Sequence, residues 1–400
     1  MNYKVKHFVT YDGERFSQLY DAEEGGFPLY YPTSYIARSV RSRATHKTQQ
    51  VHLEAVKRVC EWEAQQNIRL ALRFPSRQFL QQFEIDSLVK HLVSSRSGRD
   101  WDVICRDKAN TYIAYAARYL RWLACEVIGE IGADVKAAID EQHHSLISAV
   151  ARKSGSSSAS KQRISVMQLP NETTQALFEL FKNPLNGVKK EGDQGPRMRN
   201  VVMLRILYET GMRRGELLSL KLANFVEAIA GESARLRIER NHHDKLDSRV
   251  HQPVAKTLGR IVNISAETEQ QLIRYRDKWR PSDGSDFLFL NHRGGRFQSN
   301  PVTETGFNSA LDKLKEAFPA LEPLHPHLLR HDWNYRFSKL ADKEGLEFET
   351  ERTMREMLMG WKPNSNMSLL YNQRHIQERV NDIGRELASD TMHRGQKKWP

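Results

Sequence analysis

Cysteine is scarce in this sequence: Cys60, Cys105 and Cys125 are the only three in 400 residues. Their number is odd and no two form a Cys-x-x-Cys pair, which argues against a disulfide framework and against a cysteine-based zinc site. His242-His243-Asp244 is the nearest approach to a cluster of metal ligands, but adjacent side chains rarely converge on one ion. The sequence therefore predicts a reduced protein that contains no metal.

Long apolar runs are also missing. No stretch is long and apolar enough to span a bilayer, and residues 1–7 lead into no apolar segment of the kind found in secretory signals. A compact polybasic tail beside a lipidation signal is absent as well. We therefore expect a cytoplasmic protein without a membrane partner.

Basic residues, by contrast, are abundant. Lys and Arg number 61 against 49 Asp and Glu, which gives a formal net charge of +12 and a pI of about 9.5. Such an excess indicates a polyanionic partner. With 39% hydrophobic residues the chain can form packed cores. At roughly 100–200 residues per domain, its length predicts two to three domains.

Composition and periodicity divide the chain into five segments. Residues 1–44, rich in tyrosine and poor in periodicity, are predicted to be an N-terminal extension or arm. Apolar residues recur at helical spacing over 45–150, which predicts an all-α helical domain with a basic face. The Ser/Gly-rich residues 151–164 are typical of a flexible basic linker. A second domain over 165–387 and a basic tail over 388–400 complete the predicted order.

The second domain combines predicted helices with a small sheet. A helix over 198–209 should end at Gly211 in a left-handed conformation, and another helix should follow through Glu216. Alternating runs predict the antiparallel strands of the sheet at 235–239, 250–254 and 261–264. Lys256 would lie in the turn between the last two. The predicted fold class is therefore multidomain, with an all-α first domain and a mainly helical α+β second domain.

A histidine- and arginine-rich stretch follows Pro326, a residue that suits the first position of a helix. On such a helix His327 and Arg330 share a face, and His331 lies one position further round. A planar guanidinium beside an imidazole fits phosphate oxygens, and Arg213 occupies a tight helix–helix turn that would fix a second long side chain. Two arginines on one phosphodiester would stabilise a five-coordinate transition state. The stretch therefore predicts phosphoryl transfer, with a solvated basic helix face as the alternative.

Three motifs together resemble those of the tyrosine recombinase (phage integrase) family. Thr210-Gly211-Met212-Arg213-Arg214-Gly215-Glu216-Leu217 is similar to its first arginine box, and His327-Leu328-Leu329-Arg330-His331 to its second. Met359-Gly360-Trp361, followed by Tyr371, is similar to its nucleophile box. The resemblance spans about 165 to 385. It implies a catalytic domain of the tyrosine recombinase type, preceded by a helical core-binding domain that binds DNA.

The resemblance also implies a role for each matched residue. Tyr371 would be the nucleophile that forms a 3′-phosphotyrosyl link with DNA. Arg213 and Arg330 would clamp the non-bridging phosphate oxygens in the transition state. His327 would assist proton transfer at the tyrosine, and Lys256 would protonate the leaving 5′ oxygen.

Four further positions belong to the same expectation. Trp361 occupies a site that the family fills with His or Trp, either as an N–H donor or through packing alone. Glu216 and His331 would brace the site from behind. Lys245 is the alternative to Lys256 as the general acid.

Basic side chains outside these boxes are candidates for contacts with the DNA backbone: Arg118, Arg121, Arg152, Lys153, Lys161 and Arg163. The resemblance implies double-stranded DNA as the partner, a homo-oligomer on DNA in the form of a synaptic tetramer, and accessory DNA-bending or directionality proteins. It places the protein in the cytoplasm with the nucleoid. It also implies that no cofactor is needed, because the covalent intermediate conserves the energy of the broken bond.

Three functions remain open beside a recombinase for prophage or mobile-element integration and excision. A telomere resolvase and a type IB topoisomerase would use the same residues. From a different class, the chain could be a catalytically inactive, sequence-specific DNA-binding protein. The presence of every expected catalytic side chain favours an enzyme.

Overall fold

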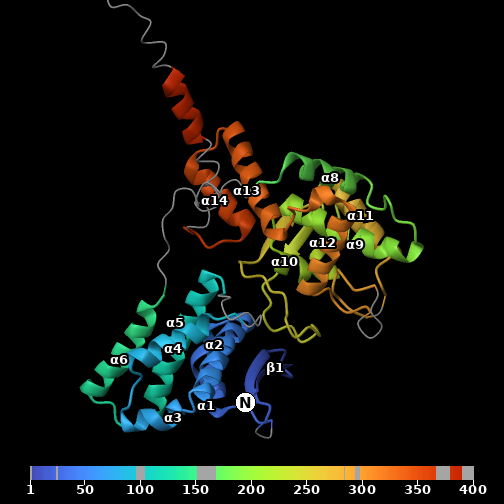
Figure 1. Cartoon of the computed structure of the whole chain (residues 1–400). Helices are drawn as coiled ribbons and strands as arrows, with labels where there is room; N and C mark the ends of the chain where they lie inside the picture. Colours follow the sequence, from blue (N-terminus) through green and yellow to red (C-terminus); the bar gives the residue numbers. More distant parts are fainter. Residues whose placement is uncertain are drawn as a thin grey trace, which may run out of the picture. The chain divides into compact units, whose positions relative to one another are not determined.

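The computed structural model describes residues 2–23, 26–95, 104–150, 168–282, 284–292, 298–365 and 379–389. The chain divides into two units, Met1–Ser154 (unit 1) and Gly155–Pro400 (unit 2), whose elements are labelled in Figure 1. Among the helices in the described ranges, none has both the length and the apolar character needed to cross a membrane.

Unit 1 combines a helical bundle with a β-hairpin. Its elements are β1 (Tyr3–Val9), β2 (Arg15–Asp21), α1 (Tyr30–Tyr35), α2 (His46–Gln65), α3 (Leu70–Arg73), α4 (Gln82–Val93), α5 (Arg106–Val127) and α6 (Ala133–Ser148). The long helices α2 and α5 form its centre, and each buries one apolar face.

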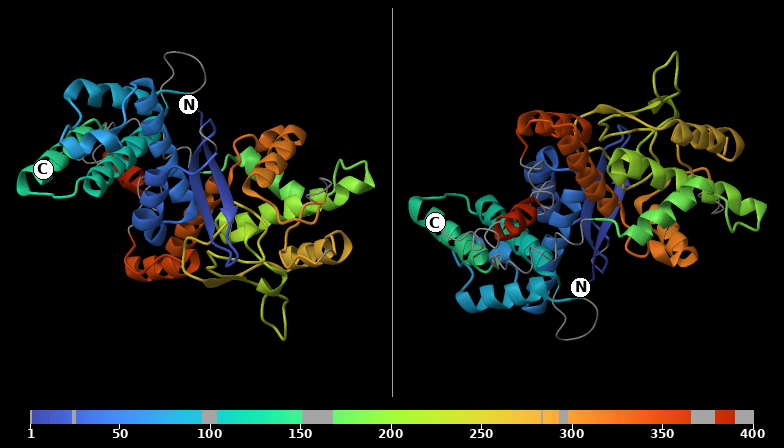
Figure 2. Two further views of the ribbon diagram at one scale, coloured as in Figure 1. Left: turned by 90° about the horizontal axis from the view of Figure 1, so that it is seen from below. Right: turned by 90° about the horizontal axis from the view of Figure 1, so that it is seen from above.

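The N-terminal hairpin belongs to the core of unit 1. β1 pairs antiparallel with β2 along its whole length, and the hairpin packs on α2 (Figure 2). Phe16 and Leu19 of β2 and Tyr35 of α1 are buried in the same cluster as the apolar faces of α2 and α5. The structure thus differs from the arm predicted for residues 1–44. The segment packs through tyrosines and a few apolar residues on one face of a two-stranded ribbon, a pattern too short for a periodicity signal.

Unit 2 is mainly helical with a small sheet. Its elements are α8 (Asn171–Lys182), α9 (Glu191–Thr210), α10 (Arg214–Leu218), β3 (Phe225–Val226), β4 (Arg235–Ile238), β5 (Arg260–Asn263), α11 (Ala266–Lys278), α12 (Glu304–Ala317), α13 (Pro326–Lys343) and α14 (Phe348–Met359). Helix α9 lies in the core: Val201, Val202, Leu204 and Ile206 are all buried. The predicted combination of a helical first domain with a mainly helical α+β second domain is confirmed, with the hairpin of unit 1 as an addition.

The sheet of unit 2 has the order β3-β4-β5, and both pairings are antiparallel. The strands predicted at 235–239 and 261–264 correspond to β4 and β5. The two-residue strand β3 was not predicted, because two residues are too few to reveal an alternation.

The strand predicted at 250–254 is wrong, since these residues lie in a loop. The loop is anchored by a buried ion pair in which Arg249 Nη2 lies 2.7 Å from Asp247 Oδ2. Arg249 Nη1 also donates to the main-chain carbonyls of Leu218 (3.0 Å) and Val302 (2.6 Å). Side-chain hydrogen bonds to helix ends and loops therefore hold this segment, in place of a strand ladder.

Gly211 closes α9 as the sequence predicts. Its φ is +61°, in the left-handed region, and its N–H donates to Leu207 O at 3.0 Å. A Cβ at this position would lie 2.7 Å from Cγ of Trp333 on α13. Trp333 is fixed there because its Nε1 donates to Glu209 O at 2.8 Å. The turn between α9 and α10 therefore requires glycine both for its backbone conformation and for the close approach of α13.

Replacing Gly211 by alanine should destabilise unit 2 more than replacing Gly187, which also has a positive φ (+76°) but open space around it. The left-handed backbone costs each variant roughly 1–2 kcal/mol. The contact with Trp333 should cost Gly211→Ala about 1–3 kcal/mol more. Urea unfolding followed by tryptophan fluorescence measures the difference. Equal losses in the two variants would contradict the packing argument.

Candidate active site

Helix α13 carries the histidine- and arginine-rich stretch at its first turn. Pro326 is the first helical residue, as predicted, and His325 caps the helix by accepting the Leu328 N–H at its Nδ1 (3.1 Å). Arg330 is only 1% exposed, and its Nη1 donates to Gly211 O at 2.7 Å. This hydrogen bond ties the second arginine box directly to Gly211 of the first.

Arg213 is held at the start of α10. Its backbone N–H donates to Glu216 Oε2 at 3.0 Å, and its Nη1 lies 3.5 Å from Glu216 Oε1. The backbone is thus fixed, whereas 24% of the side chain remains exposed. An anchored arginine with a partly exposed guanidinium can approach an anion without a large loss of conformational entropy.

The Glu216 carboxylate is fully buried and connects three segments of the chain. It accepts hydrogen bonds from Thr257 Oγ1 (2.6 Å) and Arg260 Nη2 (2.7 Å), in addition to the Arg213 backbone. Arg260 Nε also donates to Leu358 O at the end of α14, at 2.7 Å. Burial by itself raises the pKa of Glu216. The charge of Arg260 and the hydrogen bonds outweigh burial, so that the pKa lies below its ordinary value of 4.5.

The segment after α14 is held on the loop that carries Lys256. Gly360 has a φ of +65°, and its carbonyl accepts the Leu258 N–H at 2.9 Å. A Cβ on Gly360 would lie 2.8 Å from Leu258 O, so only glycine fits here. Trp361 is buried, and its ring centroid lies 5.6 Å from the guanidinium carbon of Arg330. Tyr371, ten residues further on, lies outside the described residues.

Several of the predicted site residues lie close enough to His327 for their charges to affect its pKa. This pKa lies below the ordinary value of 6.5, first because the ring is partly shielded from solvent, which penalises the charged form. The positive charges of Arg330, Arg213, Arg214 and Lys256 lower it further, in that order. The structure therefore gathers the two arginine boxes and the exposed Lys256 around one imidazole. At neutral pH this imidazole is uncharged amid four cations, an arrangement suited to a phosphate.

His331 is the neighbour of His327 on the next turn of α13. The ring centroids of His327 and His331 are 6.3 Å apart. Burial, followed by the neighbouring His327 and His325, lowers the pKa of His331 to about 4. His331 is consequently neutral at pH 7 and adds no charge to the site, and the bracing role expected from the sequence stays a prediction.

The predicted DNA contacts outside the boxes are less well supported. Arg121 of α5 pairs with Asp140 Oδ1 at 2.7 Å, so its charge is partly compensated within unit 1. Arg118 lies 5.6 Å from the ring centroid of Tyr115. The other four, Arg152, Lys153, Lys161 and Arg163, lie outside the described residues.

Sequence reasoning missed Arg260, Thr257 and His325. Arg260 begins a strand, and no local pattern shows that it reaches Glu216 and α14. Thr257 follows Lys256 directly, but its acceptor lies in another part of the chain. The histidine before Pro326 was a usable signal, because the residue before a helix-starting proline is placed to cap it.

Arg260→Gln should lower the free energy of unfolding of unit 2 by about 3–5 kcal/mol, because it leaves the charge of Glu216 buried without its partner. The double variant with Glu216→Gln should lose less than the sum of the two single losses. Denaturant unfolding of the four chains measures this coupling.

Arg276→Gln is the matched control, since its pair with Glu227 (2.5 Å) is partly exposed. A loss of about 0–1 kcal/mol is expected there. Additive losses at Arg260 and Glu216 would show that the buried pair does not couple these segments.

Comparison with known proteins finds relatives of unit 2. A model of the phage integrase family matches residues 185–341. The tyrosine recombinase XerD of Listeria monocytogenes serotype 4b is 30% identical over 142 residues, which cover 34% of this chain and 40% of XerD. The tyrosine recombinase XerC of Staphylococcus carnosus is 26% identical over 190 residues, which cover 46% and 50%. The chain thus spans about half or less of the length of these curated relatives.

The similarity in structure covers more of the chain than the similarity in sequence does. A crystal structure of the XerH site-specific recombinase, bound to a palindromic difH substrate after cleavage, aligns with a TM-score of 0.50. The alignment covers 88% of this chain and 82% of XerH at 14% identity, so it establishes a shared fold. The family match and the two arginine boxes that meet at Gly211 identify residues 185–341 as a segment of the phage integrase type, and the relatives matched in sequence are tyrosine recombinases.

Proposed function

We propose that this protein cleaves and rejoins DNA as a site-specific tyrosine recombinase, through a 3′-phosphotyrosyl intermediate. The observation that carries the proposal is the cluster around His327, in which Arg213, Arg330 and Lys256 bring positive charge to a neutral imidazole. Preorganised cations stabilise the charge that develops on a phosphoryl group in the transition state.

In the proposed reaction the phenolic oxygen of Tyr371 attacks the phosphorus of a DNA phosphodiester. Its proton passes to His327, which is neutral and can accept it. The bond between phosphorus and the 5′ oxygen breaks. Lys256 donates a proton to this oxygen, which becomes a free 5′-hydroxyl. Attack by a 5′-hydroxyl on the phosphotyrosyl link reverses these steps and rejoins the strand. No external energy source is needed, since one phosphodiester exchanges for another.

Lys256 is favoured over Lys245 as the general acid. Lys256 is exposed, and its charge is one of those that lower the pKa of His327. The neighbouring Thr257 and Leu258 are tied to Glu216 and Gly360, which fixes the loop beside both arginine boxes. A mobile ammonium group on an anchored loop suits proton delivery to a leaving oxygen.

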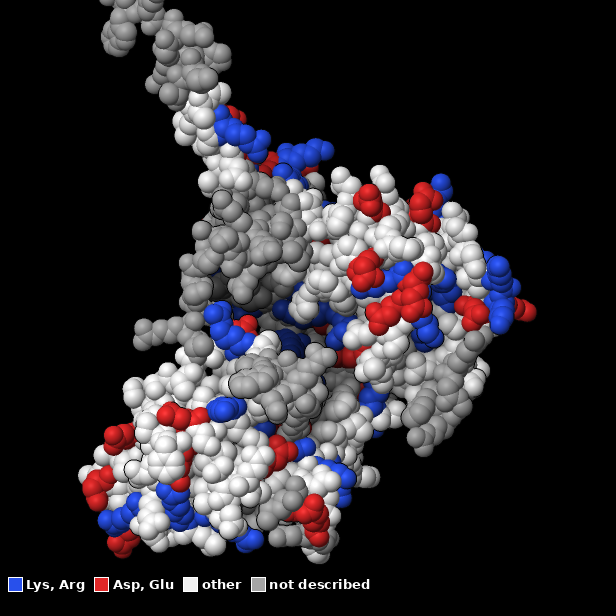
Figure 3. Space-filling model, in the orientation of Figure 1, with Lys and Arg blue, Asp and Glu red and all other residues white. Residues whose placement is uncertain are grey.

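Double-stranded DNA is the proposed partner, bound by the cations of unit 2 and by a core-binding domain at 45–150. The cations of unit 2 meant here are Arg213, Arg330 and Lys256. On the part of unit 2 at the right of Figure 3, by contrast, acidic and basic side chains alternate. Phosphate contacts of this kind would make affinity strongly salt-dependent. A synaptic tetramer, accessory DNA-bending or directionality proteins, and a cytoplasmic site at the nucleoid complete the proposal. The proposed biological role is prophage or mobile-element integration and excision.

Covalent trapping tests the enzyme directly. Wild type, Tyr371→Phe and a control, Tyr11→Phe, are expressed with the native locus and denatured rapidly in EDTA, and the ends of protein-linked DNA are sequenced. Tyr11 is 99% exposed, so its variant should behave as wild type. We expect adducts at one discrete site in wild type and control, and none in Tyr371→Phe.

Two other outcomes would change the assignment. Adducts scattered over many sequences would favour a type IB topoisomerase, and adducts confined to a hairpin end would favour a telomere resolvase. DNA binding without adducts in any of the three proteins would contradict the catalytic proposal and leave a DNA-binding protein.

The pH dependence of cleavage follows from His327. Because its pKa lies below 6.5, the ring is neutral above that pH and becomes protonated as the pH falls through its pKa. Single-turnover cleavage should therefore be insensitive to acid down to pH 6.5 and decline only below it. His327→Gln should cleave slowly, and its rate should not decline further as the pH falls below 6.5. A wild-type rate that is already halved above pH 6.5 would contradict the proposed proton acceptor.

A further inference from the structure

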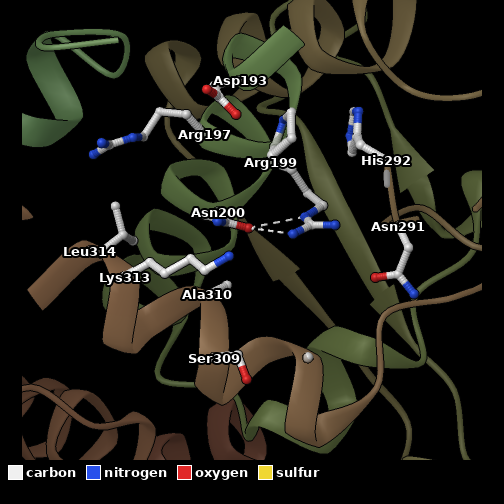
Figure 4. A pocket seen from close by; sticks show the side chains of 12 residues that line it. Asp193, Arg197, Arg199, Asn200, Asn291, His292, Ser309, Ala310, Lys313 and Leu314 are labelled. Atoms are coloured by element: carbon white, nitrogen blue, oxygen red, sulfur yellow. Dashed lines mark hydrogen bonds between the residues drawn. The ribbon is translucent and has the colours of Figure 1, made fainter. Parts of the chain in front are cut away.

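A second cationic site lies in unit 2, in a cavity between the N-terminal half of α9 and α12. Its volume is about 320 Å³, and Asn291 and His292 close one side (Figure 4). Small-molecule sites begin at about 300 Å³. None of the residues that line the cavity belongs to the candidate active site, which gathers around Gly211 at the opposite end of α9.

The innermost charge of the cavity is Arg199. Its side chain is buried (7% exposed), and its guanidinium donates to Asn200 Oδ1 (3.0 and 2.8 Å) and to Leu290 O (2.7 Å). The acceptors of all three hydrogen bonds, an amide oxygen and a main-chain carbonyl, are neutral. Within the described part of the chain no carboxylate pairs with this guanidinium, and burial lowers the pKa of Arg199. A buried cation without a counter-ion is costly, and an anion in the cavity would offset that cost.

Two further cations line the same space. Arg197 is half-buried, and its Nη1 is buried without a hydrogen-bond acceptor among the described residues. In Figure 4 the side chain of Lys313 points from α12 toward Asn200 and Arg199 on α9. Asp193 is the acidic residue of the lining, so the lining holds three cations and one carboxylate.

His292 adds a hydrogen-bonding group without adding charge. Burial, and then the charge of Arg199, lower its pKa to about 4, so the ring is neutral at pH 7. Its Nε2 is buried and has no partner in the described structure. Donors therefore reach the cavity from α9, from α12 and from the 291–292 segment, which is three directions.

We propose that this cavity binds a phosphate group through Arg197, Arg199 and Lys313. Donors that approach from several directions suit a tetrahedral oxyanion better than a planar carboxylate. The phosphate can belong to a small phosphate ester, for which the cavity has room, or to the DNA backbone. The proposal stands independently of the reaction at Tyr371.

Binding of inorganic phosphate to the full-length chain tests the site. At constant ionic strength we expect phosphate to raise the unfolding temperature of unit 2 above its value in chloride. Affinity measured by calorimetry should fall about tenfold for each cation removed in Arg197→Gln and Lys313→Gln. Both side chains are partly exposed, so these variants should fold. Lys182→Gln, an exposed lysine away from the cavity, is the control.

Phosphate can also bind at the candidate active site, and Arg213→Gln separates the two. Phosphate binding that survives in Arg213→Gln and is lost in the Arg197→Gln/Lys313→Gln double variant supports the cavity. Binding lost only in Arg213→Gln, equal binding in wild type and double variant, or no effect of phosphate beyond that of chloride overturns the proposal.

The salt dependence of duplex DNA binding identifies the source of the phosphate. A slope of log K against log salt that is smaller by about one unit for each cation removed assigns the cavity to the DNA backbone. An unchanged slope, together with lost phosphate binding, assigns it to a small phosphate ester. Both results uphold a phosphate site.

Discussion

The buried carboxylate of Glu216 is the constraint on which the rest of the site depends. A charge with no exposure to solvent is tolerable only when its partners are in place, and those partners come from the first arginine box, the Lys256 loop and strand β5. Arg260, the main partner, also binds the end of α14. One buried ion pair thus orients residues that are far apart in the sequence, and it leaves the cations on the outer side available for an anion.

Two glycines determine how closely these segments approach. Gly211 allows Trp333 and Arg330 of α13 to meet the turn before Arg213, and Gly360 allows the segment after α14 to contact Leu258. These contacts fix the backbone from which the arginines and Lys256 extend toward His327. The outcome is an imidazole kept in its neutral form, which can accept a proton, within a positive field that favours phosphate binding.

The sequence predicted the parts of this site that are local. Gly211 as a left-handed helix cap and Pro326 as a helix start follow from single-residue backbone preferences, and both are confirmed. It could not predict contacts between distant segments: the reach of Arg260 to Glu216, or the loop over 250–254 that Arg249 anchors in place of a strand. The N-terminal hairpin was missed for the same reason, since its packing on α2 leaves no periodic pattern.

The central claim is that Arg213, Arg330, Lys256 and His327 act on one phosphate. A structure of the Tyr371→Phe chain on its DNA cleavage site tests it most directly. The account predicts that both guanidinium groups contact the non-bridging oxygens of the phosphate nearest residue 371, with Lys256 beside the 5′ oxygen. A complex in which the two arginines contact different phosphates, or in which the scissile phosphate lies away from His327, would contradict it.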